Sequence, residues 1–146
     1  MKKIVVTGGA GFIGSNLVKF LLKKKYFVIN IDNLSYSANP YNLKYIKNNK
    51  NYRFYKVDIN NKKEVLKILK KFKPMAIFNL AAETHVDRSI DNPNNFIHSN
   101  LFGVYNLLLT FKKYLSKNKS KIKLIHISTD EVYGDLPSGK RSDEKF

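Results

Sequence analysis

Short apolar runs alternate with longer segments of helical periodicity along most of the chain. The runs are rich in Val, Ile and Phe and show no regular alternation with polar residues. This pattern is typical of strands that are buried on both faces of a parallel sheet. We therefore predict five strands, at Lys3–Thr7, Phe27–Ile31, Arg53–Val57, Ala76–Leu80 and Lys123–Ser128.

Helical segments lie between these runs. We predict helices near Phe12–Lys24, Tyr41–Asn48, Lys62–Phe72 and Pro93–Leu115. Pro93 suits the first turn of the last helix, with Asn92 as a possible cap. Strands that alternate with helices indicate βαβ units with right-handed crossovers. The pattern thus predicts an α/β fold with a doubly wound parallel sheet of about five strands.

A glycine-rich segment connects the first predicted strand to the first predicted helix. Its residues Gly8, Gly11 and Gly14 have the spacing G-x-x-G-x-x-G. A dinucleotide site needs a tight turn, a backbone close to the pyrophosphate, and close packing of helix against strand. Backbone N–H groups at the start of the helix, at Phe12 and Ile13, face the negative charge in such a site. In this context the motif predicts a Rossmann-type dinucleotide-binding domain.

Two acidic residues end later strands. Asp32 follows Gly14 by 18 residues, where a carboxylate accepts hydrogen bonds from the adenosine ribose and repels a 2′-phosphate. We therefore expect NAD rather than NADP as the cofactor. Asp58 is placed to reach the adenine amino group or, alternatively, to cap the next helix. The fourth strand ends in Leu80, Ala81 and Ala82. The small side chains of this segment either let the backbone lie against a flat cofactor or serve only for close packing.

Length and composition limit the number of domains and the kinds of chemistry that the chain can carry. At about 150 residues per domain, 146 residues make one domain, and we assign 1–146 to the dinucleotide-binding domain. The absence of Cys excludes disulfides and thiolate chemistry. No apolar run approaches the length of a membrane span, and glycines interrupt the apolar start of the chain. We expect a cytoplasmic protein without a membrane partner, and no metal, because His98 and His126 have no metal-ligand spacing.

The net charge of +16 raises the question of nucleic-acid binding. The lysines are spread over three stretches, and they fall mainly on the predicted outer faces of helices. Only three of the 27 basic residues are Arg, the residue that most often reads bases. Net charge of this kind supports non-specific contacts at most, so we expect no nucleic-acid partner.

Three segments resemble the extended short-chain dehydrogenase/reductase family and, within it, the family of dTDP-glucose 4,6-dehydratases. They are Val28–Tyr36, Ala81–Ile90 and Ser128–Gly134. The Asp130-Glu131 pair of the third segment is the most specific feature, because related epimerases and decarboxylases usually lack it. In the second segment, His85 and Arg88 are expected to pack or form hydrogen bonds rather than to catalyse.

The resemblance implies a reaction on a nucleotide-sugar substrate. NAD takes a hydride from C4 of the glucosyl unit, water leaves across C5 and C6, and the hydride returns to C6. Glu131 is then the base at C5, Asp130 the acid at the C6 hydroxyl, and Thr129 the residue that bonds the sugar 4-hydroxyl. Thr84 contacts cofactor and substrate at the nicotinamide end, and Ser99 contacts NAD. The family match adds further cofactor residues, which are Asn33, Leu34, Ser35 and Ile59.

The family also uses a Tyr-x-x-x-Lys pair on a helix after the Thr-Asp-Glu segment. The chain has this spacing at Tyr52 and Lys56, but on a predicted strand far from the nicotinamide end. We therefore expect residues 1–146 to be a cofactor domain that is incomplete at its C-terminal end and inactive alone. The resemblance implies a homodimer for the full enzyme. Two alternatives stay open: a nucleotide-sugar 4-epimerase of the same family, and a non-catalytic NAD-binding remnant.

Overall fold

A five-stranded parallel sheet forms the centre of the computed structural model, which describes residues 1–117 and 121–145. Its strand order is β3-β2-β1-β4-β5, and every pair of neighbours is parallel. The predicted strands are confirmed, and their ends shift by two residues at most. The strands are β1 (Lys3–Thr7), β2 (Phe27–Asp32), β3 (Tyr52–Lys56), β4 (Ala76–Asn79) and β5 (Lys123–His126).

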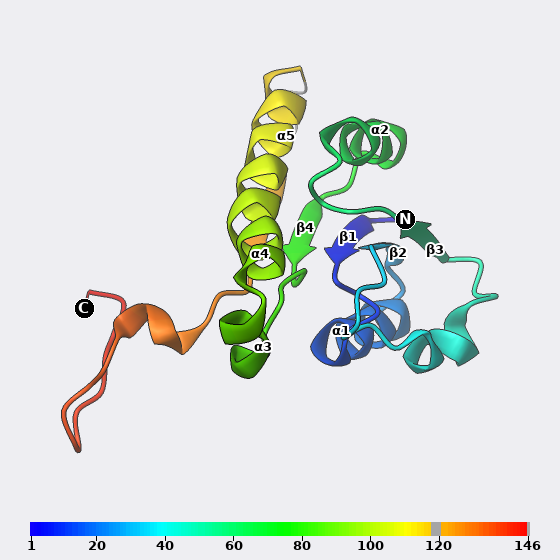
Figure 1. Cartoon of the computed structure of the whole chain (residues 1–146). Coiled ribbons are helices and arrows are strands. Elements are labelled where there is room, and N and C mark those ends of the chain that lie inside the picture. The colour runs from blue at the N-terminus through cyan, green and yellow to red at the C-terminus, as the bar shows by residue number, and fades with distance from the viewer. Residues whose placement is uncertain (118–120, 146) are drawn as a thin grey trace.

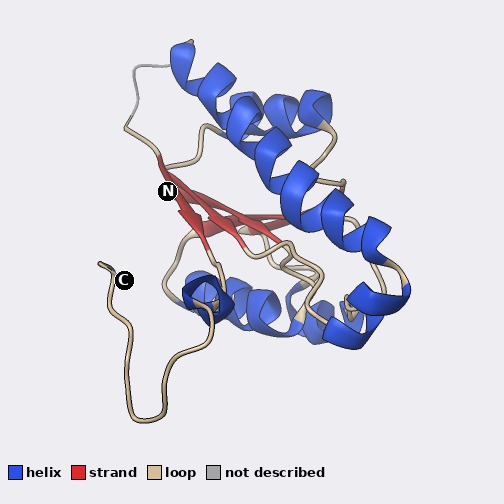
Figure 2. Ribbon diagram, turned by 60° about the vertical axis from the view of Figure 1, so that its left-hand side comes forward, coloured by secondary structure: helices blue, strands red, loops and turns tan. Residues whose placement is uncertain are grey.

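Helices cover both faces of the sheet (Figure 2). On one face α1 (Phe12–Lys23) and the 3₁₀ helix η1 (Pro40–Ile46) close a core around Val6, Val18 and Leu43. On the other face α2 (Lys62–Phe72) and α5 (Val104–Ser116) close a second core. Successive residues of a strand point to opposite faces, so Val5 and Val6 of β1 lie in different cores. This is the Rossmann-type, doubly wound sheet that the pattern predicted.

The segment predicted as one helix at Pro93–Leu115 has three parts. It runs through α4 (Pro93–Phe96), a π-helical segment η2 (Ile97–Gly103) and α5. Gly103 packs on the loop after β3, where an added Cβ would lie 2.8 Å from the Ile59 side chain. Asn92 does occupy the N-cap position before Pro93, but its side chain makes no capping bond there. The helix expected at Tyr41–Asn48 is the 3₁₀ helix η1.

Two short helices were not predicted. Helix α3 (Val86–Asp91) buries no residue, so it carries no apolar periodicity that the sequence could reveal. The 3₁₀ helix η3 (Asp130–Tyr133) follows β5. Beyond η3 the chain extends away from the sheet and its helices (Figure 1).

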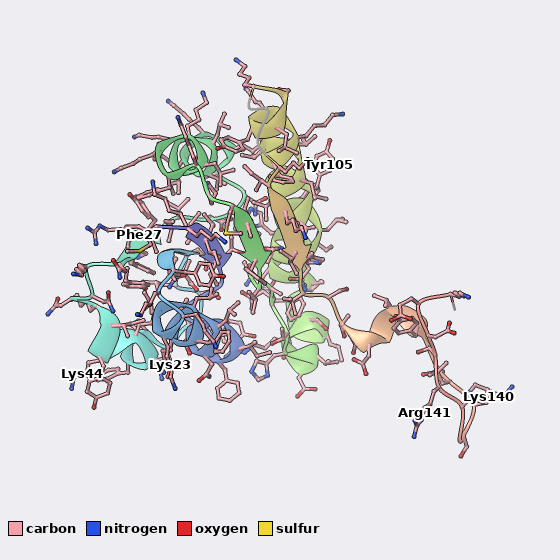
Figure 3. All side chains as sticks on the ribbon, turned by 180° about the vertical axis from the view of Figure 1, so that it is seen from behind. Lys23, Phe27, Lys44, Tyr105, Lys140 and Arg141 are labelled. Carbon is pink, nitrogen blue, oxygen red and sulfur yellow. The ribbon has the colours of Figure 1, made fainter. Side chains whose placement is uncertain are left out.

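The basic side chains do not gather in one place. Lys23 and Lys44 lie at the surface near α1 and η1, whereas Lys140 and Arg141 lie on the extended C-terminal segment (Figure 3). The one ion pair among the described residues joins Lys67 to Glu64 of α2, at 3.7 Å. In the same part of the chain, no helix has both the length and the apolar character to cross a bilayer.

Candidate functional site

The carboxyl ends of β1, β4 and β5 lie side by side at one edge of the sheet. Thr7 pairs in register with Asn79, and Asn79 pairs with His126. The Thr7 hydroxyl donates to Asn79 Oδ1 (2.5 Å), and Asn79 Nδ2 lies 2.9 Å from His126 Nδ1. The strand order changes direction between β1 and β4, and ligands of doubly wound sheets bind at such a switch point. Asn79 could not be predicted from the sequence, because a buried Asn at a strand end has no distinctive motif.

The glycine-rich loop begins directly after β1. Gly8 has φ +69°, and its N–H donates to the Ile31 carbonyl (2.9 Å). A Cβ at Gly8 would lie 2.6 Å from the Leu80 carbonyl oxygen, and a Cβ at Gly14 would collide with the Gly8 carbonyl. The backbone therefore occupies the space that side chains would take, in the tight turn and the close helix contact that the spacing predicted.

Helix α1 starts immediately after this loop, with Gly11 at its N-cap. Phe12 and Ile13 form its first turn, and their side chains are largely exposed. Amide groups in the first turn of a helix have no acceptor within the helix, and the helix dipole is positive there. This end of α1 can accept an anionic group such as a pyrophosphate.

Asp32 links the glycine-rich loop to the segment after β2. Its carboxylate is buried; Oδ2 accepts from the Ala10 N–H and Oδ1 from the Leu34 N–H, both at 2.8 Å. Leu34 has φ +60°, an uncommon backbone conformation for a leucine, which is often found where a ligand site imposes geometry. Next to it, the Ser35 N–H donates to Asn33 Oδ1 (3.0 Å). Each Asp32 oxygen keeps acceptor capacity, so the carboxylate can still accept from a ribose.

Asp58 lies at the end of the segment after β3. Its Oδ1 accepts from the Asn60 N–H (2.8 Å) and its Oδ2 from Asn33 Nδ2 (3.1 Å). Burial raises the pKa of Asp58, but the hydrogen bonds from Asn60 and Asn33 outweigh burial and hold the pKa below its usual value. Asn61, not Asp58, caps α2, by accepting from the Glu64 N–H (3.1 Å). The alternative role of Asp58 as a helix cap is therefore wrong.

The loop after β3 also contacts the π-helical segment. Asn60 Nδ2 donates to the His98 carbonyl (3.0 Å), and Asn106 Nδ2 donates to Asn60 Oδ1 (2.8 Å). Ile59 is buried between these elements. Ser99, predicted to contact the cofactor, is the next residue of η2 after His98. Asp58 and Ser99 therefore belong to elements that this amide network joins.

The segment after β4 runs along the same edge. The Ala81 N–H donates to the Thr7 hydroxyl (3.4 Å). The backbone of Glu83 is bonded twice to the Asn100 side chain, which donates to the Glu83 carbonyl (2.8 Å) and accepts from the Glu83 N–H (2.9 Å). Ala82, which lies between Ala81 and Glu83, is exposed, and so is Thr84, which follows Glu83. A ligand can therefore reach the Thr84 side chain.

Thr129, Asp130 and Glu131 follow β5 at the same edge. Thr129 caps η3, with its Oγ1 accepting from the Glu131 N–H (3.3 Å), and Thr129 Oγ1 also lies 3.3 Å from Asp130 Oδ1. All three residues are exposed. Both carboxylates can act on a bound molecule, but the described residues do not bury them. Among those residues, no group of three or more His, Asp or Glu side chains could hold a metal ion.

Known proteins share both the sequence and the fold. A family model described as GDP-mannose 4,6 dehydratase matches residues 5–146. The dTDP-glucose 4,6-dehydratase of Haemophilus influenzae is 46% identical over 141 residues, which cover 93% of this chain and 42% of that protein. The chain thus spans about two fifths of the length of the curated relatives it matches. The resemblance found in the three sequence segments is confirmed.

Solved structures agree with this match. The dTDP-glucose 4,6-dehydratase of Bacillus anthracis in complex with NAD has a TM-score of 0.84 and 41% identity, over 99% of this chain and 43% of that one. The UDP-glucose 4-epimerase of Thermus thermophilus with NAD has a TM-score of 0.82 and 33% identity, over 98% and 43%. The glycine-rich loop, the switch point and these matches together show that the chain belongs to the GDP-mannose 4,6 dehydratase family.

Proposed function

We propose that the chain is the cofactor-binding part of an NAD-dependent dTDP-glucose 4,6-dehydratase. The observation that carries this proposal is the alignment of three segments at one sheet edge: the glycine-rich loop, the segment after β4, and Thr129–Glu131. The relatives bear the name of this enzyme, and the Bacillus anthracis structure contains NAD. Because Gly8 has no Cβ, the glycine-rich loop packs directly on the Leu80–Ala81 backbone, in the tight turn that a dinucleotide site requires.

Different residues of this chain bind different parts of NAD. The start of α1, at Phe12 and Ile13, binds the pyrophosphate, and Asp32 accepts hydrogen bonds from the adenosine ribose. Asp58 contacts the adenine amino group, and its lowered pKa keeps it an anionic acceptor. Bound NAD supplies the acceptor and later the donor of a hydride. Asn33, Leu34, Ser35, Ile59, Ser99 and the Leu80–Ala82 backbone complete the proposed cofactor site.

The acid and base residues act on the sugar. Glu131 takes the proton from C5, and Asp130 gives a proton to the C6 hydroxyl, which leaves as water. Thr129 bonds the 4-hydroxyl, and Thr84 contacts the substrate from the segment after β4. Two carboxylates on successive residues after one strand suit this division of labour, because elimination needs a base and an acid at neighbouring carbons.

The decisive experiment uses a chimera in which residues 1–146 replace the matching segment of the Haemophilus influenzae relative. With dTDP-glucose we expect a 4-keto-6-deoxy sugar nucleotide. With UDP-glucose we expect no UDP-galactose, because the Asp-Glu pair favours dehydration over epimerisation. A folded, NAD-bound chimera that forms UDP-galactose supports the epimerase alternative. One that forms no product at all supports the non-catalytic alternative.

The proposal extends to assembly and location. Large apolar side chains of η2 and α5 are exposed, among them Leu101, Phe102 and Leu108, and Tyr105 lies on the outer side of α5 (Figure 3). A second copy of the enzyme that packs on this helix would remove them from water. We therefore propose a homodimer, which sedimentation of the chimera tests through its mass, and we place this dimer in the cytoplasm.

A further inference from the structure

A cluster of aromatic and charged side chains joins the segment after β2 to the segment after β4. The Tyr36 ring interacts with the Arg88 guanidinium, whose Cζ is 3.9 Å from the ring centroid, and with the His85 ring, whose centroid is 5.7 Å away. Tyr36, Glu83 and Arg88 also line one cavity of about 170 Å³. Tyr36 is not among the predicted cofactor residues, so the proposed binding site gives these contacts no role.

The contacts of Tyr36 with Arg88 and Glu83 are attractive and stabilise this cluster. A guanidinium within about 6 Å of a tyrosine ring centroid is attracted to the face of the ring. Glu83 is only 7% exposed, and its Oε2 has no hydrogen-bond partner among the described residues. Tyr36 is itself 43% exposed; its partial desolvation, the charge of Glu83 and a hydrogen bond to Glu83 raise its pKa, and the charge of Arg88 offsets part of this. The phenol is neutral near neutral pH and can donate to the buried Glu83 carboxylate, which needs donors.

The two segments that meet at Tyr36 serve opposite ends of the proposed cofactor site. Tyr36 directly follows Asp32–Ser35, the segment placed at the adenosine ribose. Thr84, placed at the nicotinamide end, lies between Glu83 and His85, and both of those residues interact with Tyr36. The Glu83 backbone is fixed separately by Asn100. Tyr36 thus contacts the residues on both sides of Thr84.

We propose that Tyr36 is a positioning residue that couples occupation of the adenosine segment to the placement of Thr84. When a ribose binds Asp32–Ser35, the Tyr36 side chain transmits the effect of that contact to residues 83–88 through Arg88, His85 and Glu83. Thr84 is then in place before the sugar arrives. This inference rests on the proposed function, because it takes the dinucleotide as the ligand.

Hydrogen–deuterium exchange of the chain with ADP tests the coupling. ADP lacks both the nicotinamide and the ribose that carries it, so protection of residues 83–91 must come through the protein. We expect ADP to slow exchange there by about two- to ten-fold, the scale set by one cation–π contact and its packing. Tyr36→Ala and Arg88→Ala should each bind ADP but lose this protection, whereas Tyr36→Phe, which keeps the ring, should retain most of it.

The matched control is Tyr45→Ala, because Tyr45 of η1 is 93% exposed. This variant should bind ADP and protect residues 83–91 as the unmodified chain does. Equal protection in Tyr36→Ala and the unmodified chain would overturn the coupling. So would faster exchange throughout the Tyr36→Ala chain without ligand, since it would mean a merely structural role. If the unmodified chain binds no ADP, the proposed function itself fails, and the coupling fails with it.

Discussion

The two ends of the candidate site differ in how much structure surrounds them. At the adenosine end, β1 and β2 are buried along almost their whole length, and both oxygens of the buried Asp32 accept backbone hydrogen bonds. At the β5 end, the strand is at best half-buried, and Thr129, Asp130 and Glu131 are exposed. The cofactor cradle is therefore part of the core of the fold, whereas the acid and base residues are not.

The position of each strand in the sheet explains this difference. β1 has a neighbour on both sides, and helices cover both faces, so its end is fixed from every direction. β5 is the last strand of the described sheet and pairs only with β4 there. Substitutions at the adenosine end should therefore change stability and cofactor binding, whereas substitutions at the β5 end should change the rate of the reaction.

The largest effect is expected from Glu131→Gln at the β5 end. Removal of the proposed base should lower the rate of C5 hydrogen exchange by about 10²–10⁴-fold, the usual range for general acid–base catalysis. Exchange of the substrate C5 hydrogen with deuterated solvent, measured in the chimera, reports it. The NAD affinity and melting temperature should change little, because Glu131 is exposed and its N–H bond to Thr129 remains.

The control for this variant is Glu144→Gln, which removes a carboxylate from the extended C-terminal segment. Its exchange rate should equal that of the unmodified chimera. Undiminished C5 exchange in Glu131→Gln would remove Glu131 from the base role. A large loss of NAD affinity would contradict the separation of the two ends.

A pair of isoleucines tests the same comparison through stability. Ile31 of β2 is fully buried, whereas Ile127, just after β5, is 44% exposed. Ile31→Ala should lower the free energy of unfolding by about 2–5 kcal/mol, because it leaves a cavity in the core. Ile127→Ala should cost less than about 1 kcal/mol, since less apolar surface is withdrawn from water. Urea denaturation measures both, and equal losses would mean that the β5 end is as tightly packed as the centre.

Cofactor selectivity should depend on the adenosine end alone. Calorimetric titration of the chain should show tighter binding of NAD than of NADP, because the Asp32 carboxylate repels a 2′-phosphate. Asp32→Asn should reduce the preference about ten-fold and cost about 1–3 kcal/mol of stability, since its amide group faces a backbone N–H that loses its acceptor. Glu131→Gln is the control and should leave the preference unchanged. Tighter binding of NADP by the unmodified chain would refute the role of Asp32.

Sequence patterns were informative where burial was continuous. The strands and the α1 and α2 helices follow from apolar runs and periodicity, and Lys62–Phe72 was predicted with its observed ends. Helix α3 buries nothing, so no apolar pattern marks it. The π-helical segment at Ile97–Gly103 ends where Gly103 packs on Ile59, a contact between distant parts of the chain that no local pattern marks.

The site shows the same division. The glycine spacing predicted the turn at Gly8 and the close contact at Gly14, because the positive φ of Gly8 and the packing of Gly14 on Gly8 are set within the loop itself. The partners of Asp32 could not be predicted, since its acceptor bonds come from Ala10, across the sheet edge, and from a left-handed Leu34. Tyr36 was also missed, because its contacts arise only when the segments after β2 and β4 meet.

The smallest expected effect is the pH dependence of Asp58. Its folded pKa lies below the usual value near 3.8, so the carboxylate contributes stability above that pH. The contribution is lost as the pH falls through the lowered pKa, because protonation removes the preference of the Asn60 and Asn33 donors for the charged form. Asp58→Asn should therefore melt at a lower temperature than the unmodified chain near neutrality.

The difference between the two melting temperatures should shrink once the pH falls below about 4 and vanish at still lower pH. Asp135→Asn, on the extended C-terminal segment, carries the same change in net charge and corrects for its general effect. Because Asp58 is only partly buried, solvent screening keeps the whole effect well below that of Ile31→Ala. A difference that stays constant down to the most acid pH would show that the Asp58 hydrogen bonds do not depend on its charge.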